Sequence, residues 1–328
     1  EDVLEIVLLW HGKKYEVEIK ETATYRDLQL LAYSETSVRP EHQKLFLRHK
    51  GKSCNDDLKI SELGLRNKQK LKLMGTSEDE IEALELQHRT AQSEAGMVLD
   101  DFDWDINPGN YTLWSRSDAE KSLIKMAKKI EINIMNPPRQ GKPLLVLDLD
   151  HTLLHFSRHM VNTDQHDQML RPYMHNFLER VYRHYDIVIW SQTKWTWVEI
   201  KLTELGMLSN PKYAICFALD TSVMFKVVGF RNGNPKRHKV KALGLIWAKC
   251  HHWSRQNTIH IDDLARNFAM NPECGLKCTA FRRDKNPEQD TELLRIAAYL
   301  ELLAVKHGDF TQVDHNQWQE YLAKHESK

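Results

Sequence analysis

The sequence predicts a chain of two domains, a small α+β domain followed by an α/β domain with a central parallel sheet. Three observations lead to this prediction. The chain has 328 residues, a length typical of about two domains. Strands with alternating apolar residues and one helix are expected over residues 1–76. Over residues 138–328, buried strands are expected to alternate with helices. The stretch between them, residues 77–137, is expected to be a linker with helices.

The first domain is expected to contain a β-hairpin, one helix and two further strands. Apolar residues alternate over Leu4–Leu8 and again over Tyr15–Ile19, which is typical of a hairpin with one buried face. The segment Thr24–Tyr33 has apolar residues at helical spacing, and Thr24 is the expected N-cap. The two further strands are predicted at Lys44–Leu47 and Lys70–Met74.

The linker is expected to contain a short helix at Ile81–Arg89 and a longer one before the second domain. Ser117 and Glu120 form a capping-box pattern, which predicts that the longer helix runs to about Ile134.

Strands and helices alternate through the second domain, which indicates a parallel sheet with crossover helices. The predicted strands are Leu144–Leu147, Asp186–Trp190, Ala214–Leu219, Asn257–Ile261 and Gly275–Phe281, with a hairpin insert at Phe225–Phe230. The predicted helices are Arg171–His184, Trp195–Leu205, Asp290–Lys306 and a last amphipathic helix near Trp318.

Composition excludes several classes of protein. Lys+Arg and Asp+Glu both number 46, so the net charge gives no reason to expect nucleic acid or a membrane surface as the main partner. The sequence contains no apolar run of about 18 residues, the length that spans a membrane. The first residues do not resemble a secretory signal, so the five cysteines are expected to be reduced thiols inside a cell. Cys274 and Cys278 could form half of a metal site, but buried free thiols are favoured.

One motif stands at the end of the first apolar strand of the second domain. Leu144–Leu147 runs directly into Asp148, and Asp150 and Thr152 complete a D-x-D-x-T pattern. A short, wholly apolar run is typical of a strand buried on both faces. Ligand sites in open α/β sheets lie just beyond the carboxyl ends of such strands, so Asp148 is expected to lie in a functional site.

Polar residues follow two other predicted strands in the same way. Asp186–Trp190 ends on Ser191, and Asn257–Ile261 runs into Asp262 and Asp263. Carboxylates from separate strands that meet at one edge repel one another strongly unless a cation lies among them. Mg²⁺ prefers oxygen ligands, and one or two carboxylates with waters suffice for it. The sequence therefore predicts a Mg²⁺ site at this edge.

The D-x-D-x-T pattern resembles motif one of the haloacid-dehalogenase superfamily, in the branch of Mg-dependent serine/threonine phosphatases that act on the RNA polymerase II tail. The resemblance implies a Rossmannoid α/β fold in which Asp148 is the nucleophile that forms an aspartyl-phosphate. It also implies that Asp150 protonates the leaving oxygen and then activates water, while Thr152 fixes the loop by hydrogen bonds. His151 stands where the family often has another residue, and it either shifts the pKa of Asp150 or points away.

The second and third motifs of this family each have one favoured match and one alternative. Motif two is a Ser or Thr after the second strand, which implies that Ser191 holds phosphate oxygens; Thr193 fits less well. Motif three is a lysine that offsets the phosphate and carboxylate charge. Lys241 matches it, and Lys239 is the alternative within the same basic stretch.

Motif four is the acidic pair Asp262 and Asp263, and the following Arg266–Phe268 also resembles the family's sequence. Sibling phosphatases imply that Asp263, rather than Asp262, binds Mg²⁺ directly. The other protein ligands implied by the resemblance are Asp148 and the backbone carbonyl of Asp150.

The β-β-α-β-β order of the first domain closely resembles ubiquitin, with its β-grasp fold. Ubiquitin binds partners through an apolar patch on its sheet. The resemblance implies that the matching patch here consists of Phe46, Lys72 and Met74, with Trp10 nearby. An exposed aromatic residue on a sheet face is a candidate protein-binding anchor.

The two resemblances together imply a family of nuclear phosphatases that dock on the 19S regulatory particle of the 26S proteasome. In that family the ubiquitin-like domain is the docking module, and phosphoserine and phosphothreonine on proteasome subunits are the substrates. We accordingly expect a monomeric nuclear enzyme with a phosphoprotein substrate and with no nucleic acid or membrane partner. The alternatives are a phosphatase for the RNA polymerase II tail and a catalytically inert proteasome adaptor.

Overall fold

The computed structural model describes residues 3–47, 54–77, 80, 116–155, 169–231, 234–283 and 287–326. The chain divides into two compact units. The first comprises Glu1–Ser93, Met135–Pro137 and Thr196–Ala214, and the second comprises the rest of the chain. The predicted helix at Ile81–Arg89 lies outside the described residues.

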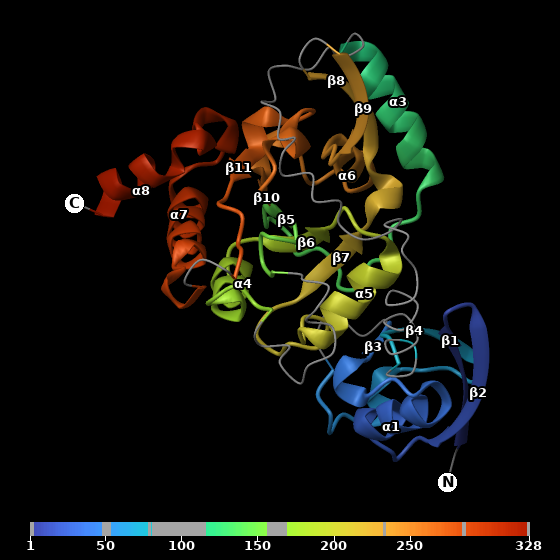
Figure 1. Ribbon diagram of the computed structural model, residues 1–328. Helices are drawn as coiled ribbons and strands as arrows, with labels where there is room; N and C mark the ends of the chain where they lie inside the picture. The colour runs from blue at the N-terminus through green and yellow to red at the C-terminus, as the bar shows by residue number, and fades with distance from the viewer. Residues whose placement is uncertain are drawn as a thin grey trace. The chain divides into compact units, whose positions relative to one another are not determined.

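The first unit contains a four-stranded sheet in the order β2-β1-β4-β3, and one helix packs on it (Figure 1). The elements are β1 (Val3–Trp10), β2 (Lys13–Lys20), α1 (Tyr25–Thr36), β3 (Lys44–Leu45) and β4 (Gln69–Met74). Strand β1 is antiparallel to β2 and parallel to β4, and β3 is antiparallel to β4. Alternate residues of the strands face α1, and the inward ones, such as Ile6, Leu8 and Leu71, are fully buried. The predicted ubiquitin-like order of elements is confirmed.

Helix α1 begins with the N-cap that the sequence predicts. The Thr24 side chain accepts a hydrogen bond from the Asp27 backbone N–H, and the Asp27 carboxylate accepts one from the Thr24 N–H at 2.8 Å. The helix runs three residues beyond the predicted end and stops at Ser37, which adopts the left-handed conformation with φ 55°.

The expected exposed patch of the first unit needs one correction. Lys72 is exposed, Phe46 is half-buried, and the Lys72 ammonium lies 5.7 Å from the Phe46 ring centroid. Met74, however, is only 3% exposed, so the prediction that it belongs to an open surface is wrong. Strand alternation points Met74 outward with Lys72, but a second segment of the same unit meets this end of β4. The Gly75 N–H donates to the Glu199 carboxylate at 2.9 Å.

Trp10 is buried at the same end of the sheet, and its indole N–H donates to the Gly75 carbonyl at 2.8 Å. It therefore contributes to the structure of the unit rather than to the exposed patch.

The second unit is built on a parallel five-stranded sheet in the order β11-β10-β5-β6-β7, with β5 in the middle (Figure 1). The strands are β5 (Leu144–Leu147), β6 (Asp186–Trp190), β7 (Ile215–Leu219), β10 (Thr258–Asp262) and β11 (Gly275–Lys277). Every residue of β5, β6, β7 and β10 is buried, as their apolar composition predicts. The predicted central parallel sheet is confirmed.

Helices and one hairpin complete the fold. They are α3 (Arg116–Lys129), α4 (Met174–Tyr182), α5 (Trp195–Glu204), α6 (Gly244–Lys249), α7 (Glu292–Lys306), α8 (Trp318–Glu326) and the hairpin of β8 (Phe225–Arg231) with β9 (Asn234–Val240). Most of α5 lies in the segment assigned to the first unit. No helix among the described parts of the chain combines the length and apolarity that crossing a membrane requires.

Several elements are shorter than predicted: β3 ends at Leu45 rather than Leu47, and α3 ends at Lys129 rather than at about Ile134. Local contacts accompany the difference in two others. Helix α4 begins three residues after the predicted Arg171, because Tyr173 has φ 66° and cannot continue a right-handed turn. Strand β11 ends at Lys277 rather than Phe281. Beyond it, the Phe281 N–H donates to the His151 carbonyl, so this segment turns toward the loop after β5.

Candidate functional site

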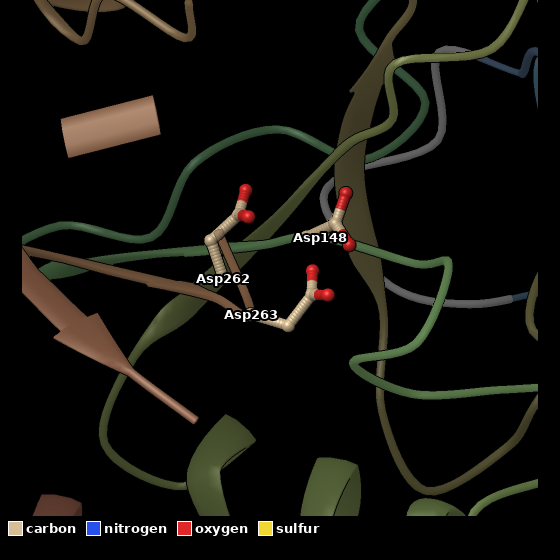
Figure 2. Close-up of side chains that lie close together, drawn as sticks. All are labelled: Asp148, Asp262 and Asp263. Carbon is tan, nitrogen blue, oxygen red and sulfur yellow. The ribbon is translucent and has the colours of Figure 1, made fainter. Parts of the chain in front are cut away.

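The site lies where β5, β6 and β10 end, because neighbouring parallel strands place their carboxyl ends at one edge. Asp148 follows β5, Asp262 ends β10, and Asp263 comes next. One carboxylate oxygen from each of these three residues lies within 4.8 Å of the others, and all three side chains are buried. Figure 2 shows the three side chains close together. The sequence placed these residues 114 and 115 positions apart, and the sheet brings them together.

The loop after β5 holds the other two members of the D-x-D-x-T pattern. The Thr152 hydroxyl donates to Asp148 Oδ2 at 3.1 Å, which is the loop-fixing contact that the resemblance implies. Asp150 is 6% exposed and accepts a hydrogen bond from the Ser191 hydroxyl at 3.1 Å. The loop therefore carries two carboxylates with different environments, which is the arrangement that separate nucleophile and proton-transfer roles require.

Ser191, at the end of β6, is fully buried beside Asp150. Its alternative, Thr193, is adjacent in space: the two hydroxyl oxygens are 2.8 Å apart, and the Thr193 N–H donates to Ser191 Oγ at 3.1 Å. Ser191 is the member of the pair that reaches Asp150 directly.

The structure distinguishes the two candidate lysines. Lys241 is completely buried, and its ammonium donates to Asp148 Oδ1 and to Asp262 Oδ2. Burial alone would lower the pKa of Lys241, but the two carboxylates outweigh it and hold that pKa above its ordinary value. Lys239 instead donates to the Thr221 carbonyl at 2.9 Å. Lys241 is therefore the lysine of the acidic cluster.

Asp262 is saturated with hydrogen-bond donors. It accepts from Lys241 at 2.6 Å, from the Leu264 N–H at 2.9 Å and from the Asn267 amide at 2.9 Å to both oxygens. Burial alone would raise the pKa of Asp262. Lys241 and then His260 lower it by more than burial raises it, so the net pKa lies below its usual range. Asp262 has little capacity left for a metal ion and serves to hold Lys241.

Asp263 has the opposite environment. It is 5% exposed, and among the described residues its Oδ2 atom is buried without a hydrogen-bond partner. Burial, and then the neighbouring carboxylates of Asp262 and Asp148, raise the pKa of Asp263 to about 9. Burial also raises the pKa of Asp148 to about 7, with Lys241 opposing the rise. Asp148 shares the single ammonium of Lys241 with Asp262, so the three carboxylates carry more negative charge than Lys241 balances, and a divalent cation would supply the rest. The donor set thus fits Mg²⁺, with Asp263 rather than Asp262 as a direct ligand.

Asn267 and His151 make contacts near the site that the sequence analysis did not predict. Asn267 was noted only as part of a family-like stretch, yet its amide holds both oxygens of Asp262. His151 has φ 64°, and its Nδ1 lies 3.2 Å from the Phe281 carbonyl. That ring is engaged with the segment after β11, and the sequence carried no signal for this contact because the two residues are 130 positions apart.

Comparisons with known proteins agree with the fold and the site. Residues 143–311 match the family described as NLI interacting factor-like phosphatase, and residues 6–78 match the ubiquitin family. The chain is 38% identical over 325 residues to ubiquitin-like domain-containing CTD phosphatase 1 of Gallus gallus, covering 98% of both chains. The same-named protein of Drosophila melanogaster is 38% identical over 330 residues, covering 99% of this chain and 100% of the relative.

A parallel sheet bearing a buried acidic cluster and lysine, joined to a ubiquitin-like domain, defines this protein as a protein phosphatase of the haloacid-dehalogenase type. The chain belongs to the family of ubiquitin-like domain-containing CTD phosphatases. Both the predicted resemblance and the predicted enzyme class are confirmed.

Asp263→Asn and Asp262→Asn are expected to have opposite consequences. Asp263→Asn removes a carboxylate that has too little positive charge around it, so the melting temperature in EDTA should stay near that of the wild type. The fit of Asp263 as a Mg²⁺ ligand predicts that any rise in melting temperature on adding Mg²⁺ disappears in this variant. Asp262→Asn should lower the melting temperature even in EDTA, since breaking a buried ion pair costs about 3–5 kcal/mol. Differential scanning fluorimetry measures both; an undiminished Mg²⁺ effect in Asp263→Asn would contradict the ligand assignment.

Proposed function

We propose that this phosphatase is Mg²⁺-dependent and hydrolyses phosphoserine and phosphothreonine in proteins through an aspartyl-phosphate. We further propose that it acts in the nucleus on proteasome subunits while its ubiquitin-like domain is docked on the 26S proteasome regulatory particle. The observation that carries the enzymatic part is the cluster of Asp148, Lys241 and Asp263 at the end of β5, with Asp150 beside it.

The first chemical step assigns one carboxylate to each role. An Asp148 oxygen forms a bond to phosphorus while the bond from phosphorus to the serine or threonine oxygen breaks. Asp150, as the carboxylic acid, donates its proton to the departing oxygen. The Ser191 hydroxyl, 3.1 Å from Asp150, lies where it can orient that carboxyl group and donate to a phosphate oxygen in turn. Lys241 places a fixed positive charge against Asp148.

In the second step Asp150, now a carboxylate, takes a proton from a water molecule that attacks the phosphorus of the aspartyl-phosphate. Inorganic phosphate leaves, and Asp148 is regenerated as a carboxylate. Asp148, the Asp150 carbonyl and Asp263 would hold Mg²⁺, which supplies charge neutralisation for the phosphate and the carboxylates.

A phosphate-release assay tests the enzymatic proposal. The full chain is incubated with a phosphoserine peptide and, separately, with para-nitrophenyl phosphate. We expect turnover with MgCl₂, none with excess EDTA, and recovery when Mg²⁺ is restored. Equal turnover in EDTA and in MgCl₂ would rule out the metal dependence, and no turnover under any condition would favour the inert adaptor.

Docking on the proteasome predicts that Phe46→Ala weakens binding to purified 26S proteasomes by about tenfold or more, as expected for an aromatic anchor. Leu30→Ala is the matched control, because Leu30 is 47% exposed on α1 of the same domain but lies outside the proposed patch. Binding is measured by pull-down at graded protein concentration. Equal binding of the two variants would contradict the assignment of Phe46.

The name of the relatives, which are called CTD phosphatases, favours a second candidate substrate, the RNA polymerase II tail. Phosphopeptides from the RNA polymerase II tail and from proteasome subunits, compared at equal concentration, distinguish the two. A higher kcat/KM for the polymerase peptide, together with activity on proteasomes that is unchanged by Phe46→Ala, would support the polymerase tail.

A further inference from the structure

Arg171 is a buried arginine to which the reaction described above gives no role. Its side chain is 1% exposed, and its donors bind three separate acceptors. The Nε–H donates to Asp290 Oδ2 at 3.0 Å, one terminal nitrogen donates to Glu292 Oε2 at 2.6 Å, and the other donates to the backbone carbonyl of Thr152 at 3.1 Å. A planar guanidinium with three acceptors in different directions is fixed in position and in orientation.

The two acidic partners of Arg171 are themselves held in place. Asp290 accepts a hydrogen bond from the Glu292 N–H at 3.0 Å, at the start of α7. Glu292 also accepts from the Thr279 backbone N–H at 3.1 Å and from the Thr279 hydroxyl at 3.2 Å. The two carboxylates balance the buried charge of Arg171 and fix its guanidinium. The guanidinium that binds the Thr152 carbonyl is therefore held in place by Asp290 and Glu292.

The groups around Arg171 fix three successive carbonyls of the loop after β5. The Arg171 side chain binds the Thr152 carbonyl, and the Arg171 N–H donates to the Leu153 carbonyl at 2.9 Å. The guanidinium carbon also lies 5.6 Å from the Phe281 ring centroid, and the Phe281 N–H donates to the His151 carbonyl at 2.7 Å. These three hydrogen bonds therefore hold the backbone of the loop at residues 151–153.

This hold determines what the loop presents to the site. The His151 N–H donates to the Leu154 carbonyl at 2.7 Å, and because a peptide unit is planar and trans, the Asp150 carbonyl points the other way. The Thr152 hydroxyl is directed to Asp148 at 3.1 Å. The carbonyl of His151, next to Asp150, is bound by the Phe281 N–H. The carbonyls of Thr152 and Leu153 are bound by Arg171.

We propose that Arg171 is a positioning residue of the phosphatase. It sets the direction of the Asp150 carbonyl and of the Thr152 hydroxyl without touching the substrate or the metal. This inference rests on the proposed function, in which the Asp150 carbonyl is a Mg²⁺ ligand. Outer partners of metal ligands typically contribute about 10–100-fold to metal affinity or activity.

The chain provides a matched control in Arg180. Its guanidinium donates to both oxygens of Glu301, at 2.9 and 2.6 Å, and its NH1 lies 3.4 Å from the Leu294 carbonyl. Like Arg171 it joins the segment around α4 to α7, but none of its described contacts reaches the loop after β5. Arg180→Gln therefore removes a comparable arginine–carboxylate bridge without releasing the loop.

The test compares Arg171→Gln, Arg171→Lys and Arg180→Gln in the full chain. Hydrogen exchange is measured on peptides that contain the amides of residues 151–154, and the Mg²⁺ concentration for half-maximal phosphate release is measured in parallel. Both Arg171 variants should exchange faster in this segment, and their half-maximal Mg²⁺ concentration should rise about 10–100-fold. Arg180→Gln should match the wild type in both measurements. The lysine variant keeps the positive charge between the acidic residues, so it reports on loop position if the glutamine variant fails to fold.

The test distinguishes failure of the positioning role of Arg171 from failure of the proposed phosphatase function. If Arg171→Lys and Arg180→Gln had equal hydrogen exchange and equal Mg²⁺ dependence, the positioning role would be overturned. The enzyme would still be a phosphatase. If the wild type released no phosphate, the proposed function would fail, and hydrogen exchange would still decide whether Arg171 holds the loop.

Discussion

Asp148→Asn is expected to lower kcat for a phosphoserine peptide by at least about a thousandfold, because the amide cannot attack phosphorus. The substitution keeps the shape of the side chain and leaves an oxygen for the Thr152 hydroxyl. It also removes one negative charge from a cluster in which Asp148 already has a raised pKa, so the variant should remain folded. Circular dichroism and thermal unfolding check the fold, and initial rates with saturating Mg²⁺ measure the loss.

Asp220→Asn is the matched control for this variant. Asp220 follows β7 at the same edge of the sheet, but its carboxylate accepts from the Ser222 N–H at 3.0 Å, outside the acidic cluster. Its kcat should stay within about twofold of the wild type. Retention of more than a tenth of wild-type kcat by Asp148→Asn would show that another group is the nucleophile.

Lys241→Met is expected to give the largest loss of stability among these variants. The ammonium is fully buried between Asp148 and Asp262, and removing it leaves two carboxylates without their counter-charge. Removing one partner of a buried ion pair typically costs about 3–5 kcal/mol of unfolding free energy. Urea unfolding followed by tryptophan fluorescence measures the change, since Trp190 and Trp253 are buried in the same unit.

Lys239→Met is the control for Lys241→Met. It removes a lysine two positions away whose ammonium binds only the Thr221 carbonyl and hydroxyl among the described contacts. Its cost should be below about 1 kcal/mol, as for one ordinary hydrogen bond. Equal losses for the two lysines would mean that the acidic cluster does not depend on Lys241.

The central part of the fold and of the site could be predicted from the sequence because the signal is local. The wholly apolar stretch before Asp148 identifies a buried strand, and parallel pairing then brings the residues after neighbouring strands to one edge. A cation among the converging carboxylates was expected on this ground, and the family resemblance chose Asp263 as the partner of Asp148; one oxygen from each of Asp148, Asp262 and Asp263 does lie within 4.8 Å of the others.

Features that depend on distant segments were not accessible in this way. The resemblance favoured Lys241 over Lys239, but the residues alone did not separate them. Strand alternation places residues two apart on one face, whereas Lys241 lies beyond the end of β9. Met74 was assigned to an open patch by the resemblance to ubiquitin, which does not reveal that Met74 is buried in this chain. Arg171 was interpreted only as the opening of a helix, because its carboxylate partners are about 120 positions away in the chain.

The long separation between Arg171 and its partners has a consequence for biosynthesis. A nascent polypeptide that has emerged as far as Lys277 contains every carboxylate of the acidic cluster, together with the strands that carry them. It still lacks Asp290 and Glu292, so the Arg171 guanidinium that binds the Thr152 carbonyl has neither of its two carboxylate partners. The order of translation therefore delays the complete anchoring of the catalytic loop until Asp290 and Glu292 have been made.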